Sequence, residues 1–488
     1  MGVMSMQRHT RKTSHRLPEG RAPLRRPGAG STHIDAVSAK DAPEHENQRL
    51  QSYETQVKGA FDRVVPLVKE LVAVQFQEDF VDIASQKITD ELGVTPPIEL
   101  LGAAWTSQLD VKTLVSHLTF AIYCKFVSTA QQVKPLAHPN CDEFVEFLTR
   151  CGFHHMDITP CADGRLAHVI RYVLRLPAEV VRRKAYAGAM FAIDDNVAKW
   201  AEVELKRTQS QSLSESKYLK IVVYHFSSVQ GDIEGCAAHG SDDLKAAAAG
   251  RNSLLGFKEA VGQSFTRPNA VEGLLIGLDT ATDAIVLHAP DQFGEIDIHS
   301  SLKATDCVGF SSAEIAAYID VKCPTAASGM RMLVTRLIEN NLAQLAYMQV
   351  NHGGIYTDIG HAERFIGIGV GFDEIQLRNL MYFGYLKTVE EGAPDINVGL
   401  KIFKGLNQSR GLATPIVIRF DYYGSVAGAK ERAIGRANRV AEALQSAYAS
   451  QFAEGDIHFM QVSRDLDTRD APMFLGSNLP SLTEENLS

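Results

Sequence analysis

A five-residue stretch, Cys161-Ala-Asp-Gly-Arg165, places a thiol, a carboxylate and a guanidinium at alternating positions. Alternate residues of an extended segment point the same way, so a strand end or a tight turn can direct all three into one pocket. A thiolate is a preferred zinc ligand, and we interpret the stretch as a candidate zinc corner. Two ordinary explanations stay open, a buried structural cysteine and a structural ion pair between Asp163 and Arg165.

Further ligands lie downstream, where the pattern predicts a strand and a turn. Residues Tyr218–Tyr224 are mostly apolar and β-branched, which predicts a buried strand, and His225 stands at its end. Cys236 follows in a glycine-bracketed turn. Sites in α/β sheets form at the carboxyl ends of strands, so we expect these two residues to meet Cys161. Three protein ligands leave the fourth zinc position open, and His239 is a rival ligand in the same turn.

Length and composition exclude several classes of protein. The chain has 488 residues, of which 45% are hydrophobic and 22% charged, and it is long enough for two or three domains. No run of about 18 apolar residues occurs, so we expect no membrane span. Residues 1–30 lack the apolar segment of a secretory signal. Seven scattered cysteines, an odd number, fit a reducing compartment better than a disulfide framework.

Residues 1–47 differ from the rest of the chain. Between Met1 and His33, seven basic residues stand against one acidic residue, a net charge of +6, whereas the whole chain carries −9. A basic segment rich in Pro and Gly buries too little apolar surface to fold, so we expect a disordered docking tail. Nucleic acid is a common partner of basic arms, but the acidic remainder of the chain and the lack of an aromatic platform argue against it.

The remaining sequence predicts three folded parts. Apolar residues recur at the 3.6-residue period over residues 48–138, which predicts a helical domain. From residue 139 to residue 361, short β-branched runs alternate with helical stretches. This alternation predicts an α/β domain with a largely parallel sheet and helices on its faces.

Residues 362–488 repeat this α/β pattern. Phe365–Asp373 resembles the entry to the zinc corner, and Pro415–Phe420 resembles the strand before His225. We interpret this part as a degenerate α/β repeat, with two unrelated α/β units as the alternative. No cysteine follows Cys323, so the repeat cannot hold a thiolate site.

The motif Cys161-x-Asp163-x-Arg165 is the signature of β-type carbonic anhydrases, and its context resembles the carboxysome shell-associated branch of that class. In ordinary β-type enzymes the second cysteine follows the histidine closely, whereas ten residues separate His225 from Cys236. The likeness covers residues 50–470 and rests on five further segments: Lys184–Phe191, Gly235–Asp242, Asn340–Leu342, His352–Gly354 and Gly360–Arg364.

The resemblance implies a zinc enzyme that interconverts bicarbonate and CO2, with one Zn²⁺ per chain held by Cys161, His225 and Cys236. Asp163 would accept a hydrogen bond from the zinc-bound water, and Arg165 would orient that carboxylate. The resemblance also implies a homo-oligomer, a dimer or a dimer-based assembly, in the carboxysome lumen at the inner face of the shell, within a bacterial cytoplasm. Rubisco would bind the basic tail, and shell proteins are further expected partners. A zinc-stabilised structural protein, its site closed by His239 or Asp163, is the alternative.

Overall fold

A computed structural model describes residues 47–48, 50–129, 141–177, 180–210, 215–229, 235–265, 269–357, 360–372, 381–382, 389–468 and 470–487. Together they form a mixed α/β protein with an N-terminal helical region, which confirms the predicted fold class. The predicted basic tail lies almost entirely outside these ranges and stays a prediction. Among the helices within them, none has both the length and the apolar character that a membrane crossing requires.

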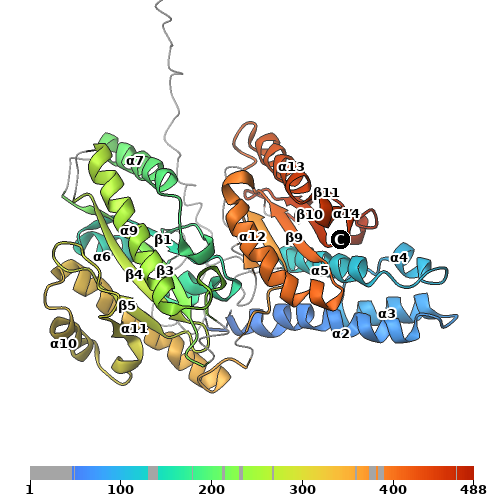
Figure 1. Cartoon of the computed structure of the whole chain (residues 1–488), viewed down its shortest axis with the longest axis horizontal. Helices are drawn as coiled ribbons and strands as arrows, with labels where there is room; N and C mark the ends of the chain where they lie inside the picture. The colour runs from blue at the N-terminus through green and yellow to red at the C-terminus, as the bar shows by residue number, and fades with distance from the viewer. Residues whose placement is uncertain are drawn as a thin grey trace, which may run out of the picture. The chain divides into compact units, whose positions relative to one another are not determined.

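The first described helices form the helical region (Figure 1). In α2 (Gly59–Val74), apolar side chains that recur at the helical period are buried, among them Phe61, Val64 and Val68. The fourth helix follows a proline pair at Pro96 and Pro97, as expected for a helix start. The elements are η1 (Tyr53–Lys58), α2 (Gly59–Val74), α3 (Phe80–Leu92), α4 (Ile98–Ala103) and α5 (Val111–Thr129).

The first sheet has the strand order β2-β1-β3-β4-β5-β6. Its first four strands in that order run parallel, and β5 and β6 continue it as antiparallel neighbours. The predicted largely parallel sheet is therefore present. The strands are β1 (Phe153–Pro160), β2 (Arg182–Arg183), β3 (Lys217–Phe226), β4 (Val271–Asp279), β5 (Ile285–His288) and β6 (Leu302–Lys303).

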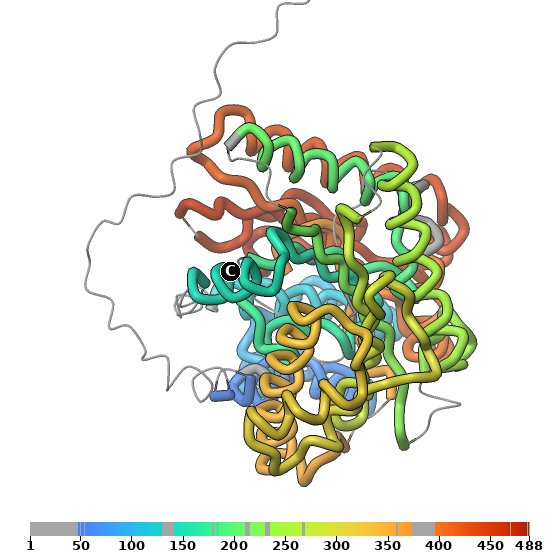
Figure 2. Tube along the Cα trace, turned by 90° about the vertical axis from the view of Figure 1, so that its left-hand side faces the viewer, coloured from blue at the N-terminus to red at the C-terminus, as the bar shows by residue number. Residues whose placement is uncertain are grey.

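Helices cover this sheet and position its loops. The long helix α9 (Asp243–Phe265) packs on β3 and β4. Gly250 allows this close approach, because a Cβ there would lie 2.8 Å from Leu275. The helices α10 (Ser312–Lys322) and α11 (Ser328–His352) lie against each other (Figure 2). The remaining helices are α6 (Cys141–Arg150) and α7 (Ile193–Ser210).

The second sheet repeats the topology of the first. Its order is β11-β10-β9-β7-β8, with β7 (Ile366–Gly369), β8 (Met381–Tyr382), β9 (Thr414–Arg419), β10 (Ile457–Ser463) and β11 (Met473–Ser477). β7 pairs in parallel with β8 and β9, as β1 does with β2 and β3. β10 is parallel to β9 and antiparallel to β11, as β4 is to β3 and β5. Five strands thus agree in order and direction, which favours a repeat over two unrelated units.

The second sheet buries both of its faces. Ile416 and Ile418 of β9 pack into a core that includes residues of α12 (Val389–Leu406) and α13 (Ala429–Ala447). Val417, between them in sequence, belongs to a different core shared with α2 and α5. Successive side chains of a strand point to opposite faces, so the N-terminal helices cover one face of the second sheet.

Candidate metal centre

The zinc corner continues the first sheet beyond β1. The backbone N–H of Cys161 donates to the carbonyl of Val223 on β3 at 3.0 Å, and that of Ala162 donates to the carbonyl of Tyr186 at 2.8 Å. The chain then enters a short 3₁₀ turn, η2 (Gly164–Leu166). These bonds hold Cys161 at the carboxyl edge of the sheet, where a site was expected.

The other two predicted ligands stand on neighbouring elements. His225 is a fully buried residue of β3, which begins one residue before the predicted strand, at Lys217, and ends two residues after it, at Phe226. Cys236 directly precedes the 3₁₀ turn η5 (Ala237–His239). Hydrogen bonding with the Cys161 thiol and with the backbone N–H groups of Ala238 and His239 lowers the pKa of Cys236.

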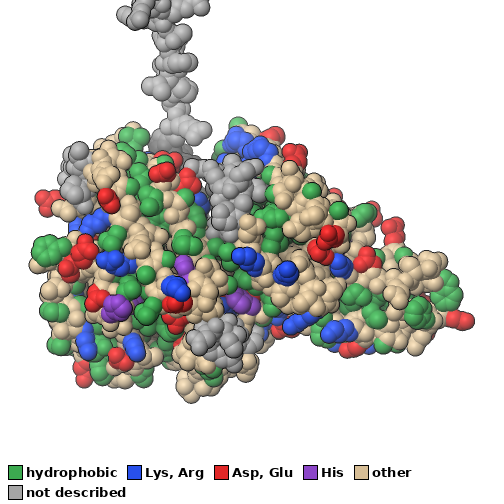
Figure 3. Space-filling view, in the orientation of Figure 1, with side chains coloured by type: hydrophobic (Ala, Val, Ile, Leu, Met, Phe, Trp, Pro, Cys, Tyr) green, Lys and Arg blue, Asp and Glu red, His purple; other side chains and the backbone are tan. Residues whose placement is uncertain are grey.

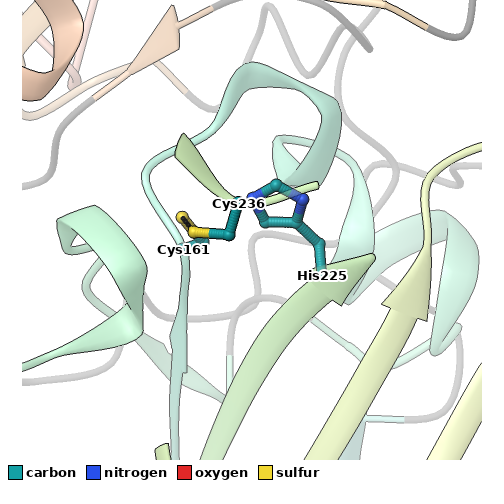
Figure 4. A group of neighbouring side chains, drawn as sticks. All are labelled: Cys161, His225 and Cys236. Carbon is teal, nitrogen blue, oxygen red and sulfur yellow. Dashed lines mark hydrogen bonds between the residues drawn. The ribbon is translucent and has the colours of Figure 1, made fainter. Parts of the chain in front are cut away.

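The structure brings Cys161, His225 and Cys236 together (Figure 4). One ligand atom from each lies within 4.8 Å of the others, and the two sulfur atoms are 3.9 Å apart. Two sulfurs bound to one tetrahedral zinc ion at about 2.3 Å would stand about 3.8 Å apart. Neither ring nitrogen of His225 has a hydrogen-bond partner among the described residues. The arrangement therefore fits a zinc ion.

The rival ligand His239 is engaged elsewhere. Its Nε2 lies 3.0 Å from the carbonyl oxygen of Gly188, and it is not part of the ligand group. Gly188 has a φ of +63°, and a Cβ at this position would come within 2.6 Å of the same nitrogen. The close approach of Gly188 thus depends on its lack of a side chain.

The predicted pair Asp163 and Arg165 lies beside the three ligands. Arg165 is fully buried; its backbone N and Nε each lie 2.9 Å from Oδ1 of Asp163, and its Nη2 lies 2.8 Å from Oδ2. Oδ2 is also 3.4 Å from Nε2 of His225. Burial alone would raise the pKa of Asp163, but Arg165, His225 and His361 together hold it well below the ordinary value. Asp163 is therefore an ionised hydrogen-bond acceptor at the edge of the site.

Comparison with known proteins agrees with this geometry. Models of the Carboxysome Shell Carbonic Anhydrase family match residues 42–131 (N-terminal), 143–361 (catalytic domain) and 362–478 (C-terminal). The chain belongs to the carboxysome shell carbonic anhydrase family. It is 43% identical to a carboxysome shell carbonic anhydrase of Prochlorococcus marinus over 90% of each chain, and 40% identical to one of Hydrogenovibrio crunogenus over 89% of this chain and 86% of the relative. A third, from Halothiobacillus neapolitanus, is 38% identical over 83% of each chain.

Two residues beside the candidate metal centre were not identified as site residues from their spacing in the sequence. His361 and Glu363 lie in the segment that enters β7. Nδ1 of His361 is 2.9 Å from Oε1 of Glu363 and 3.7 Å from Oδ2 of Asp163. Only the likeness of Gly360–Arg364 to the family singled this segment out, because nothing in the residue spacing connects it to Cys161.

The second half carries a different pair where the first half has ligands. The N–H of Val370 donates to the carbonyl of Arg419, as that of Cys161 does to Val223. By this register Val370 occupies the position of Cys161, and Asp421 that of His225. The sequence likened Phe365–Asp373 as a whole to the entry to the zinc corner, and the register identifies Val370 within it; Asp373 itself lies outside the described residues.

The counterpart site is filled by an ion pair. Arg419 and Asp421 are both buried, and Nη2 of Arg419 lies 2.7 Å from Oδ2 of Asp421. Gly371 leaves room for them, because a Cβ there would lie 2.1 Å from that same oxygen. Among the described residues that follow Glu363, no His, Cys, Asp or Glu side chain belongs to a group arranged to bind a metal.

Proposed function

We propose that this chain is a zinc carbonic anhydrase that interconverts bicarbonate and CO2 inside the carboxysome. The convergence of Cys161, His225 and Cys236 beside Asp163 carries the proposal, since three ligands leave one zinc position for the reacting water. The relatives are named carboxysome shell carbonic anhydrases, which supports the same activity for this chain.

A bound zinc ion lowers the pKa of its water to about 7 and so supplies hydroxide at neutral pH. Two thiolates and one neutral imidazole make zinc a weaker Lewis acid than three histidines do, so neighbouring groups must assist. Asp163 accepts a hydrogen bond from the reacting water and directs its oxygen toward the carbon of CO2. Arg165 holds that carboxylate in place and ionised through three nitrogens.

Burial of these groups strengthens their electrostatic effect. The three proposed zinc ligands, together with Asp163 and Arg165, are all residues that are less than a tenth exposed to solvent. Interactions between charges are stronger where water is excluded, so burial strengthens the interaction between Asp163 and Arg165. A small uncharged substrate such as CO2 suits a buried site of this kind.

The function is tested by measuring two quantities on one preparation. We expect about one zinc per chain by elemental analysis and rapid CO2 hydration and bicarbonate dehydration by stopped flow. Zinc without any turnover would instead support a structural protein with a closed site. Two groups that would close the site are engaged elsewhere, since His239 contacts the Gly188 carbonyl and Asp163 is bound by Arg165.

Asp163→Asn should keep most of the zinc and lower turnover by about ten- to a hundredfold, the usual scale for groups that tune a metal site. The amide no longer carries the charge that orients the reacting water. Asp421→Asn is a matched control, because it disrupts a different buried Arg–Asp pair, in the second half of the chain. Equal loss of turnover in both variants would assign Asp163 a structural role.

We propose a chain divided into a tail (1–47), a helical domain (48–138), a catalytic domain (139–361) and a degenerate repeat without zinc (362–488). The matched family regions, 42–131, 143–361 and 362–478, support this division. We further propose that the protein acts as a homo-oligomer at the inner face of the shell, contacts shell proteins, and supplies CO2 to Rubisco.

The basic tail is proposed to bind Rubisco. Arginine guanidinium groups pair with carboxylates on an acidic partner, and such contacts weaken as salt screens them. Deletion of residues 1–47 should abolish Rubisco binding, measured by interferometry, while zinc content and turnover remain. Unchanged affinity of the shortened chain would contradict this proposal.

On the face shown in Figure 3, basic and acidic side chains are interspersed, which does not favour nucleic acid as the partner.

A further inference from the structure

The proposed zinc site is enclosed, and its reaction moves protons. Cys161, His225, Cys236, Asp163 and Arg165 are each at most 6% exposed. Bicarbonate and one proton give CO2 and water, so every turnover consumes or releases one proton. That proton must cross between the enclosed site and the solvent, which requires a titratable group that contacts both.

Among the described residues, the carboxylate of Asp163 faces the side chains of Arg165, His225 and His361. Guanidinium groups do not lose their proton in proteins, and His225 is a proposed zinc ligand. The His361 side chain is 19% exposed, whereas that of Asp163 is 4% exposed. His361 is therefore the one titratable side chain of these three that remains available and also reaches solvent.

We infer that His361 is the proton relay of the proposed carbonic anhydrase, and that Glu363 is a positioning residue that orients its ring. This inference rests on the proposed function and assigns roles to two residues outside the ligand set. The segment that joins the two sheets supplies both residues, so the site draws on chain beyond the first sheet.

The ring orientation decides which nitrogen carries the exchanged proton. Nδ1 of His361 donates to Oε1 of Glu363 at 2.9 Å, because a carboxylate can only accept. Nε2 is then the nitrogen that gains and loses a proton, whereas Nδ1 is the nitrogen that lies 3.7 Å from Oδ2 of Asp163. It lies 3.4 Å from Nη2 of Arg165, and this contact is a hydrogen bond only while Nε2 is unprotonated.

The charges around His361 favour the protonated form of its ring. Burial alone lowers the pKa of His361, and Arg165 lowers it further, but the carboxylates of Glu363 and Asp163 outweigh both and raise it to about 9. At neutral pH the ring therefore carries the proton that bicarbonate dehydration consumes. Bicarbonate dehydration, which forms CO2, therefore takes its proton from His361.

A second metal ion is a weaker explanation of the same cluster. One ligand atom each of Asp163, His361 and Glu363 lies within 4.8 Å of the others. However, the fully buried guanidinium of Arg165 lies 2.8 Å from Asp163 and 3.4 Å from His361. A cation placed among these groups would be repelled at short range in a medium of low polarity.

The test removes the relay and replaces it with a soluble proton donor, the imidazolium form of added imidazole. In the full-length His361→Ala protein, we expect kcat for bicarbonate dehydration to fall by about a hundredfold in dilute buffer, the lower range for acid–base groups. Added imidazole should restore kcat in a saturable way, while kcat/KM and zinc content change far less. His154→Ala is the matched control, because His154 is also partly buried and paired with a carboxylate, Glu204, at 2.6 Å.

Glu363→Gln gives an independent measurement. The substitution removes a charge that raises the pKa of His361, so the decline of dehydration kcat with rising pH should begin at a lower pH than in the unaltered protein. An unchanged pH profile would contradict the role of Glu363.

The outcomes separate this inference from the proposed function. If the unaltered protein shows no turnover, the proposed function fails and the relay fails with it. If the unaltered protein turns over and His361→Ala keeps its kcat in dilute buffer, only the relay is refuted. A loss of kcat that imidazole does not restore, with zinc retained, would make His361 structural and also refute the relay.

Discussion

Replacing Cys161, His225 or Cys236 with alanine should remove zinc and reduce carbon dioxide hydration to the background rate. The proposed site has three protein ligands, and the two that remain in each variant would not hold a tetrahedral ion tightly. Elemental analysis after dialysis should fall from about one zinc per chain to nearly none. Stopped-flow hydration on the same samples should fall in parallel.

His239→Ala and Cys151→Ala are the controls for these variants. His239 contacts the Gly188 carbonyl, and Cys151 is a buried cysteine outside the ligand group. Both variants should keep zinc. A Cys236→Ala protein that retains full zinc, together with a His239→Ala protein that loses it, would overturn the proposed ligand set.

A chain that ends at residue 361 should fail to fold stably and should be inactive. Among the buried residues that it lacks in the core shared with the N-terminal helices are these five: Phe365, Phe372, Val417, Met460 and Val462. Burial of each such side chain contributes about 1.5–3 kcal/mol, so their loss costs about 8–15 kcal/mol, comparable to the whole stability of a domain. Ala162 of the zinc corner also packs in the core of the second half.

Thermal unfolding and zinc content test this requirement. A single substitution in the full chain, Val417→Asp, should lower the melting temperature strongly because it places a charge in the core between helices and sheet. Val426→Asp is the control, since Val426 is 42% exposed. A stable and fully active chain ending at residue 361 would contradict this prediction. Two tightly bound zinc ions per polypeptide would contradict the proposal that the second half binds no zinc.

The zinc corner shows which features of the site can be predicted from short stretches of sequence. Thiolate, imidazole and strand signals are carried by short stretches, so Cys161, His225 and Cys236 were selected from residue type and from their positions at strand ends and turns. The repeat was also visible, because Pro415–Phe420 has the same β-branched character as the strand before His225. Its register was not visible, and the structure assigns Val370 to the position of Cys161.

The sequence by itself determined the α/β class, the helical N-terminal region and the three proposed ligands, because side-chain periodicity and metal-ligand chemistry are local properties. Only the tertiary structure decided that His361 and Glu363 lie beside Asp163, almost two hundred positions away in the chain. It also decided that the N-terminal helices cover the second sheet and that an Arg419–Asp421 pair fills the counterpart of the zinc site. Such contacts join segments distant in the chain, and they depend on strand register and on which sheet face each side chain meets, which no short stretch of sequence specifies.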